Sequence, residues 1–365
     1  MERVVKPLFP KDEKDELFYR IRRRVNQVVV TLEPRYRKVR LIKAFLYPSL
    51  YLTAYIVAVT AGKHPAVLYS CYAGLGLLLV INFLNLIHDA VHGVLFRSKK
   101  WNALYVRFFD VMGANSYVWS IRHTRLHHNY PNIMGWDSDV EQSGLARIFP
   151  HSAFSRIHKY QHIYLPFLYP FYLLNWLLIR DFKDFFNKNK PVWKVTSIPR
   201  IEYWKLFGFK LFFLFYMIVL PVLVTRISWG QAAGAFLVMV FTASIFSLLV
   251  LLSPHANTEN EFPLPDAENR LPYSWFMHQL KNTNDVTHDN FLTRWVMGCF
   301  NFHVAHHLFP AVSHVYYPEI TRILREEAEK NNWPYRAYPL ITTLVNHYHL
   351  LKQNRQPENI FEEAL

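Results

Sequence analysis

Four long stretches without charge dominate the hydropathy pattern of the chain. The first two run from Ala44 to Gly62 and from Ala66 to Ile87, with a three-residue turn between them. The other two, Leu206 to Thr225 with a single lysine inside and Ala232 to Pro254, repeat that arrangement around a short turn. A helix crosses a bilayer with about 20 residues. The pattern therefore predicts an all-α integral membrane protein with four spans, paired in two helical hairpins.

A fifth uncharged stretch, Ile163 to Ile179, is a weaker candidate for a span. It is short, it contains Pro166 and Pro170, and a strongly basic segment follows it. If it crossed the membrane, that basic segment would lie outside, against the rule that Lys and Arg stay on the cytoplasmic side. We therefore expect it to be interfacial or re-entrant.

The charge distribution orients the predicted spans. Nine Lys and Arg residues lie between Arg20 and Lys43, which places the N-terminus in the cytoplasm. The region from Met1 to Arg40 is charged throughout and shows no cleavable signal pattern. We expect a basic cytosolic segment at 1–43, a membrane domain at 44–354 that includes a cytosolic helical cap, and a C-terminal tail at 355–365.

Composition narrows the class of protein. Of the 365 residues, 52% are hydrophobic and only 19% are charged, which excludes disordered, collagen-like and coiled-coil chains. Two cysteines exclude a disulfide scaffold and a cysteine-ligated metal site, and Cys71 and Cys299 are expected to pack in the core. In so apolar a chain, the net charge of +14 indicates membrane-flanking charge rather than binding of nucleic acid.

Histidine is also in excess, with 18 residues, and eight of them lie in three clusters. Residues three and four apart share a face of a helix, so His88 is expected to project with His92, His123 with His127, and His303 with His306 and His307. Adding His128 and the isolated His255, the predicted topology places nine histidines at the cytoplasmic membrane surface. They are His88, His92, His123, His127, His128, His255, His303, His306 and His307.

This ligand type and number indicate a dinuclear metal site. Neutral imidazole suits iron, copper, zinc and nickel, and nine imidazoles exceed the needs of one ion. None of the clusters contains the Glu-x-x-His pair of carboxylate-bridged di-iron bundles. Asp89, Asp137 and Asp139 are candidates to orient the ring N–H groups from outside. The other histidines are expected at the surface or in hydrogen bonds: His64, His151, His158, His162, His278, His288, His314, His347 and His349.

At these residues the sequence resembles the membrane fatty acid desaturases, whose three histidine boxes are H-x(3-4)-H, H-x(2-3)-H-H and [HQ]-x(2-3)-H-H. All three occur in order. The sequence at 115–119, 132–142 and 301–310 is similar to that of bacterial desaturases of the linoleoyl-CoA or front-end type. The resemblance extends from about Phe45 to Tyr348.

The resemblance implies four spans below a cytosolic cap that holds two irons and uses O2. The eight histidines of the boxes would be ligands, and His255 matches an additional histidine that follows the fourth span. The fused cytochrome b5 motif His-Pro-Gly-Gly is missing, so the electron donor would be a separate ferredoxin, or cytochrome b5 with its reductase. The substrate would be a fatty acyl-CoA or an acyl-lipid. A bacterial inner membrane is favoured, and the endoplasmic reticulum is second.

Three positions depart from the family pattern. Front-end members usually begin the third box with Gln, where this chain has His303, so the position of the double bond does not follow from the resemblance. The frequent acidic residue of that box is Ala305 here. In some acyl-CoA members an Asn four residues before the lone histidine holds a water on one iron, and Leu251 occupies that position.

Two other functions remain open. A lipid hydroxylase uses the same ligand set, and no residue decides between the two reactions. A metal transporter would need polar groups deep in the membrane. The predicted spans contain no histidine and few polar side chains beyond Asn82 and Asn85, which disfavours transport. Sphingolipids, sterols and carotenoids remain alternative substrates.

Overall fold

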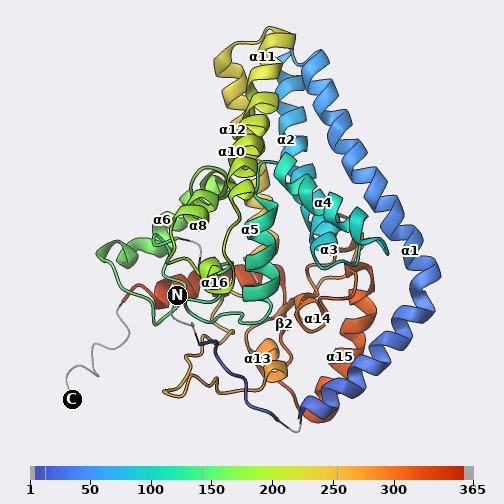
Figure 1. Cartoon of the computed structure of the whole chain (residues 1–365), viewed down its shortest axis with the longest axis vertical. Helices are drawn as coiled ribbons and strands as arrows, with labels where there is room; N and C mark the ends of the chain where they lie inside the picture. The colour runs from blue at the N-terminus through green and yellow to red at the C-terminus, as the bar shows by residue number, and fades with distance from the viewer. Residues whose placement is uncertain (1–4, 13, 142, 253, 357–365) are drawn as a thin grey trace.

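The computed structural model describes residues 5–12, 14–141, 143–252 and 254–356 (Figure 1). Most of the predicted C-terminal tail lies outside these residues. Long helices form one end of the molecule, and shorter helices and loops form a broad base at the other end (Figure 1). The long helices are α1 (Lys14–Ala61), α2 (Pro65–Asn82), α10 (Arg200–Leu214), α11 (Leu220–Thr225) and α12 (Trp229–Leu251). They form the two predicted hairpins, α1 with α2 and α10–α11 with α12.

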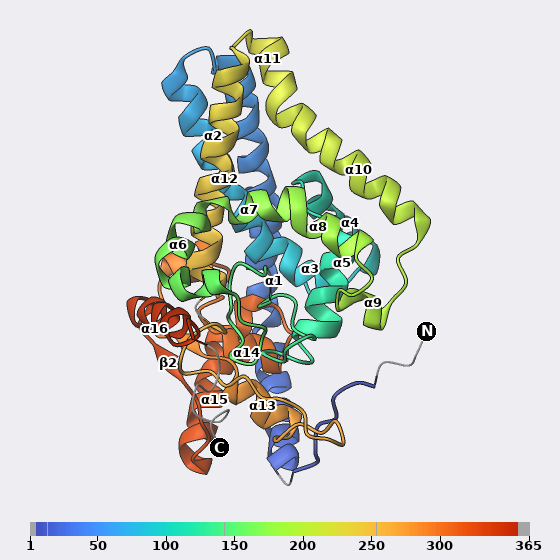
Figure 2. The ribbon, with the colours of Figure 1, turned by 90° about the vertical axis from the view of Figure 1, so that its left-hand side faces the viewer.

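Five helical stretches are long and apolar enough to cross a membrane. Four correspond to the predicted spans, and the fifth is Arg156–Phe186. This fifth stretch is helical throughout but alternates among 3-10, α and π segments, with Pro166 inside α6 and Pro170 inside η4. Its pieces α6, α7 and α8 run across the direction of α2 and α12 (Figure 2). The pieces are η3 (Arg156–Tyr160), α6 (Gln161–Leu168), η4 (Tyr169–Phe171), α7 (Tyr172–Asn175), η5 (Trp176–Arg180) and α8 (Asp181–Phe186).

The predicted boundary at residue 43 is not a boundary between elements. α1 continues without a break from the basic segment into the first span. Ile21 and Val25 of the basic part are buried against α13 (Trp275–Lys281) and α15 (Tyr317–Asn331). The segment is helical because its apolar side chains pack on the base, while its arginines face outward or pair with acids such as Glu327.

The second helix of the first hairpin leads directly into the base. α2 continues through a π-helical turn, η1 (Phe83–Ile87), into α3 (His88–Val91). α2 packs closely on α12, because Gly76 has no side chain: a Cβ there would lie 2.4 Å from the carbonyl oxygen of Met239. This close contact fixes the position of α2 along α12, and therefore the point at which the chain passes from α2 into the base.

The base is assembled from segments far apart in the sequence. Of the two cysteines, Cys299 is buried there and Cys71 is only partly buried on α2. Two short strands, β1 (Asp285–Val286) and β2 (Ala337–Tyr338), pair in parallel. The remaining helices are α4 (Lys99–Val111), α5 (Ser116–Ile121), η2 (Arg122–His127), α9 (Val192–Val195), η6 (Phe215–Val219), η7 (Leu292–Val296), α14 (His303–Leu308), η8 (His314–Tyr316) and α16 (Leu340–Gln353).

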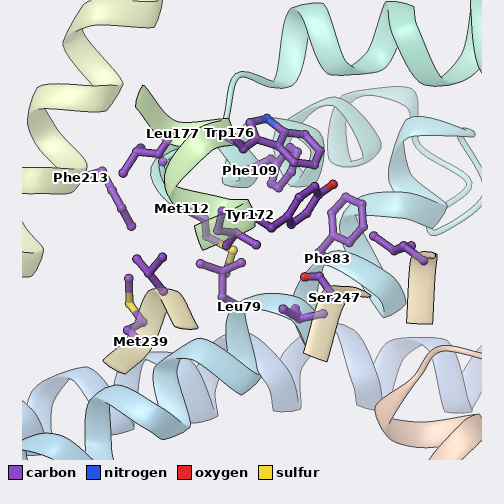
Figure 3. Close-up of a pocket in the computed structure, with 16 residues that line it drawn as sticks. Leu79, Phe83, Phe109, Met112, Tyr172, Trp176, Leu177, Phe213, Met239 and Ser247 are labelled. Carbon is purple, nitrogen blue, oxygen red and sulfur yellow. The ribbon is translucent and has the colours of Figure 1, made fainter. Parts of the chain in front are cut away.

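An apolar cavity lies between the hairpins and the transverse helices (Figure 3). Met239 of α12 and Phe213 of α10 lie at one end, Leu79 of α2 lies in the middle, and Phe83 and Trp176 lie toward the base. Its lining contains almost no polar atoms. The two hairpins and the transverse helices thus enclose a space suited to a hydrocarbon chain.

Candidate metal centre

All nine grouped histidines meet in the base, in two sets. Five offer nitrogens that lie within 4.8 Å of one another, and so do the other four. The five-histidine set consists of His88, His92, His123, His128 and His306. The four-histidine set consists of His127, His255, His303 and His307. His92 is half-buried and the other eight are buried, so the sets are shielded from bulk water.

Local helix geometry decides which histidine joins which set. The expected pairing of His123 with His127 differs from the structure, because the chain widens into the π-helical turn η2 and His128 N–H bonds to the carbonyl of His123 at 3.1 Å. His123 therefore joins His128, and His127 faces the other set. α14 also divides: the spacing predicts that His303 projects with both His306 and His307, but of these two it shares the four-histidine set only with His307, and His306 belongs to the five-histidine set. π-helical turns such as η2 are frequent at functional sites.

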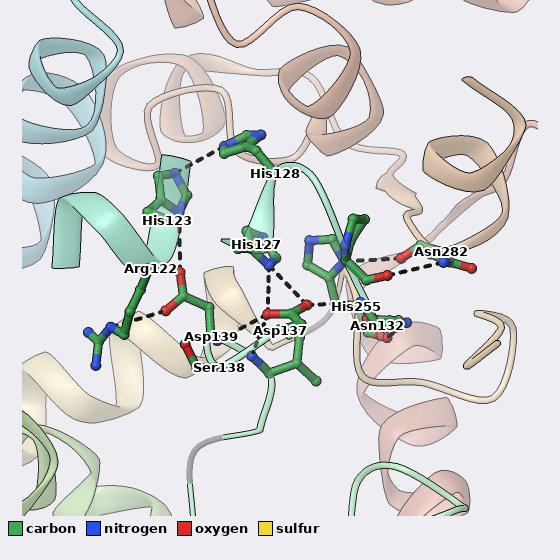
Figure 4. A network of polar contacts seen from close by, with 12 residues as sticks. Arg122, His123, His127, His128, Asn132, Asp137, Ser138, Asp139, His255 and Asn282 are labelled. Carbon is green, nitrogen blue, oxygen red and sulfur yellow. Dashed lines mark hydrogen bonds and ion pairs between the residues drawn. The ribbon is translucent and has the colours of Figure 1, made fainter. Parts of the chain in front are cut away.

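The outer ring nitrogens of five histidines are held by neighbouring groups. Nδ1 of His127 lies 3.0 Å from Asp137 Oδ1, and Nδ1 of His123 lies 3.3 Å from Asp139 Oδ2 (Figure 4). Nδ1 of His255 contacts the carbonyl oxygen of Asn282 at 3.0 Å. His307 contacts Gln279 Oε1 and His306 contacts the Tyr317 hydroxyl, each at 3.0 Å.

These contacts determine the protonation of the inner nitrogens. A neutral imidazole carries one N–H and one lone pair, so a ring that donates from Nδ1 presents a lone pair at Nε2. Burial lowers the pKa of His255 to about 3 and that of His307 well below its ordinary value, so both rings are neutral. Yet their Nε2 atoms lie only 3.0 Å apart. Two lone pairs at that separation repel, and a cation between them removes the repulsion.

The spacing fits a metal ion. The Nε2 atom of His123 lies 2.9 Å from that of His88 and 3.1 Å from that of His128. Two ligands at about 2.1 Å from one ion and about 90° apart would be separated by about 3.0 Å. The Nε2 atoms of His92 and His306 are buried without a hydrogen-bond partner among the described residues. Such unpaired buried ring nitrogens are costly unless they bind an ion.

Two of the three predicted aspartates support the histidines. Burial lowers the pKa of His127, but the charge of Asp137 and its contact with the ring outweigh burial, so the net pKa is raised. Burial also opposes ionisation of Asp139, but His123 and the guanidinium groups of Arg122 and Arg180 hold its pKa below the ordinary value. Both carboxylates are therefore charged acceptors for a ring N–H, as expected.

Asp89 is placed differently from the expectation. Its carboxylate binds Ser313 and His314 rather than one of the nine histidines. Conversely, the contacts of Gln279, Tyr317 and the Asn282 carbonyl were not anticipated. These groups lie far from the histidine boxes in sequence or outside any motif, so only the fold brings them to the site.

A second cavity lies between the apolar space and the histidines. It is lined by histidines of both sets, including His88, His123 and His255. It shares four residues with the apolar cavity: Phe83, Tyr172, Trp176 and Leu251. Leu251, one of the departures from the family pattern, thus belongs to the wall between the two spaces.

Comparison with known proteins agrees with these features. The family model described as fatty acid desaturase matches residues 63–339. The sn-1 linoleoyl-lipid 6-desaturase of Arthrospira platensis is 29% identical over 283 residues, covering 77% of this chain and 76% of the relative. The corresponding Synechocystis protein is 29% identical over 72% of this chain and 73% of its own length.

A longer relative is similar to this chain over part of its length. The acyl-lipid (8-3)-desaturase of Physcomitrium patens is 29% identical over 73% of this chain, but only 56% of its own length is matched. The family model covers most of the chain, including all nine grouped histidines. This chain therefore belongs to the fatty acid desaturase family, a family of membrane oxidoreductases.

Proposed function

We propose that this protein is an oxygen-dependent desaturase that introduces a double bond into the acyl chain of a membrane lipid at a dinuclear iron centre. The observation that supports it most is the pair of histidine sets, with lone pairs converging, beside a cavity that adjoins an apolar space. An unactivated C–H bond resists every side-chain acid or base, so this reaction needs a metal.

The nine histidines would hold two metal ions, five nitrogens around one and four around the other. Bound iron would supply the reduction of O2: two hydrogens of the chain, two donor electrons and two protons convert O2 to two waters. The protein binds and orients the ions through the outer contacts of the rings and keeps the site dry. It also fixes one stretch of the acyl chain beside the two sets.

The cavities suggest how the acyl chain lies. The methyl end would occupy the apolar cavity near Met239 and Phe213, and the reacting carbons would lie in the second cavity beside His88, His123 and His255. Trp176 separates the two spaces, and it is fixed because Arg122 and Arg180 lie over its ring at 5.2 and 4.7 Å. The distance from the methyl end to the centre would then determine the position of the double bond.

An outer groove favours a lipid substrate over a soluble acyl-CoA. This groove, lined by α6, α12 and α16, is almost wholly apolar and includes Ile245, Leu249 and Leu344. It shares Leu248 and Leu252 with the cavity at the histidines. Because α12 is a candidate span, the bilayer would cover this face, and an acyl chain would enter sideways. Relatives named acyl-lipid desaturases are consistent with this class of substrate.

We further propose four spans, with Arg156–Phe186 lying at the membrane surface, and an active site on the cytoplasmic side. The crosswise direction of α6 to α8 supports this placement (Figure 2). The electron donor would be a separate ferredoxin or cytochrome b5, and a bacterial inner membrane is the favoured location.

The test is mass spectrometry of total lipids from a host that expresses the wild type, His127→Ala or His349→Ala. His349 is exposed and outside both sets, so it provides the matched control. We expect lipids two hydrogens lighter with the wild type and the control, and none with His127→Ala. New unsaturation with His127→Ala would contradict the ligand assignment. Lipids one oxygen heavier would instead identify a hydroxylase. A metal transporter would leave the masses of the lipids unchanged.

A further inference from the structure

A lysine is buried at the start of the first predicted span. Lys43 is only 2% exposed, and its ammonium group donates to three acceptors. These are Asn85 Oδ1 at 2.8 Å, the carbonyl oxygen of Arg294 at 2.6 Å and His314 Nε2 at 2.9 Å. All three N–H groups are thus used, which is the condition for keeping a charge in the interior.

The lysine determines the state of His314 and, through it, the contact with Asp89. Because Nε2 of His314 accepts from Lys43, the ring proton lies on Nδ1. This atom is 3.0 Å from Asp89 Oδ2, at an angle that makes the contact electrostatic rather than a well-aligned hydrogen bond. Asp89 also accepts from the Ser313 hydroxyl and from the backbone N–H of His314 at 3.2 Å.

The chain of contacts ends beside the five-histidine set. Asp89 lies between His88 and His92 on the short helix α3, and both belong to that set. Three residues beyond His314, the Tyr317 hydroxyl contacts Nδ1 of His306, a third member. The segment 313–317 therefore contacts His306 directly, and it also contacts Asp89, which lies between His88 and His92 in the sequence.

We propose that Lys43, His314 and Asp89 form a buried ionic relay that positions the five-histidine set and leaves the four-histidine set unaffected. The supports of the four-histidine set lie outside the relay: Asp137 for His127, the Asn282 carbonyl for His255 and Gln279 for His307. The inference rests on the proposed metal centre and adds to it that each metal has its own positioning groups. The three relay residues act through the histidines and do not touch the substrate.

The experiment is an anaerobic titration of the metal-stripped, full-length protein with Fe(II), followed by measurement of bound iron per chain. We expect two sites in the wild type. In Lys43→Met, binding at one site weakens about ten- to hundredfold, the usual effect of losing a group that orients a ligand. The second site keeps its affinity. The matched control is Lys210→Met, because Lys210 is also a buried lysine, paired with Asp181 at 2.6 Å, but belongs to neither support.

A double variant separates positioning from folding. Removing Lys43 alone leaves the Asp89 charge buried without compensation, which itself destabilises the protein. In Lys43→Met with Asp89→Asn both charges are gone, so we expect thermal stability to recover while one iron site stays weak. Normal iron affinity at both sites of the double variant would overturn the proposal. Equal weakening of both sites in Lys43→Met would also overturn it, as would weakening of a single iron site in Lys210→Met. If the wild type itself bound no iron, the proposed centre would fail first.

Discussion

His255 and His307 face each other through nitrogens that cannot hydrogen-bond to one another. Their Nε2 atoms are 3.0 Å apart, while Nδ1 of His255 points to the Asn282 carbonyl and Nδ1 of His307 points to Gln279. Both inner atoms therefore present lone pairs. The two rings do not attract each other, so the surrounding fold must hold them in this unfavourable contact. A metal site whose ligands are held in place by their neighbours is preorganised.

Metal should stabilise the folded protein strongly. An ion that binds only the folded state at a hundred times its Kd adds about 2.7 kcal/mol to the free energy of unfolding. We expect Fe(II) to raise the Tm of the metal-stripped protein in detergent and a chelator to reverse the change. The shift should be smaller in His307→Ala. A Tm independent of metal would contradict the interpretation of the converging nitrogens.

The side-chain oxygen of Gln279 is expected to contribute to iron binding by orienting the ring of His307. Its Oε1 contacts His307 Nδ1, and its Nε2 donates to the carbonyl oxygen of His128 at 3.0 Å. Gln279→Leu removes the acceptor and should weaken iron binding about ten- to hundredfold. Gln279→Glu keeps an acceptor for His307 and should retain more affinity. Equal iron affinity for Gln279→Leu and the wild type, measured by equilibrium dialysis, would show that the amide does not orient the ring.

The contact between α2 and α12 predicts contrasting effects at two glycines. A Cβ at Gly76 would lie 2.4 Å from a backbone oxygen, whereas a Cβ at Gly74 would meet no atom of the described residues within 4 Å. Gly76→Ala forces the helices apart and should cost about 1 to 3 kcal/mol. Gly74→Ala should be neutral or stabilising, by up to about 1 kcal/mol, because alanine favours a helix. Thermal unfolding of the two variants would test this, and equal Tm values would refute the close packing.

The apolar cavity predicts a change in chain-length preference. Val240 is buried and lines the cavity away from the histidines. Val240→Phe fills part of that space, so conversion of longer acyl chains should fall more than that of shorter ones. Leu237→Phe, at an exposed site on the same helix, is the control. Competition between acyl chains of different length, followed by mass spectrometry, gives the ratio. An unchanged ratio would place the methyl end elsewhere.

Much of this architecture follows from local patterns in the sequence. Uncharged stretches of sufficient length predicted the hairpins, and helical spacing correctly paired His88 with His92. The predicted pairing of His123 with His127 is wrong because a π-helical turn changes the residues that share a face, and no residue type in Arg122–His127 marks that turn.

The supporting groups were predictable only where they are close in sequence. Asp137 and Asp139 follow the second box by a few residues and reach His127 and His123 through a short loop. Asp89 lies inside the first box and yet contacts His314, which is 225 residues away. Gln279 reaches His307 across the base. Contacts of this kind depend on tertiary packing, which no spacing rule encodes.

The central claim is that the centre removes two hydrogens from a lipid chain and transfers no oxygen to it. The most direct measurement is mass spectrometry of the lipid formed by the iron-loaded protein with a reduced electron donor under isotopically heavy O2. We predict a product two hydrogens lighter than its substrate, with the heavy isotope found only in water. A product that contains the heavy oxygen would contradict desaturation and identify a hydroxylase at the same histidine centre.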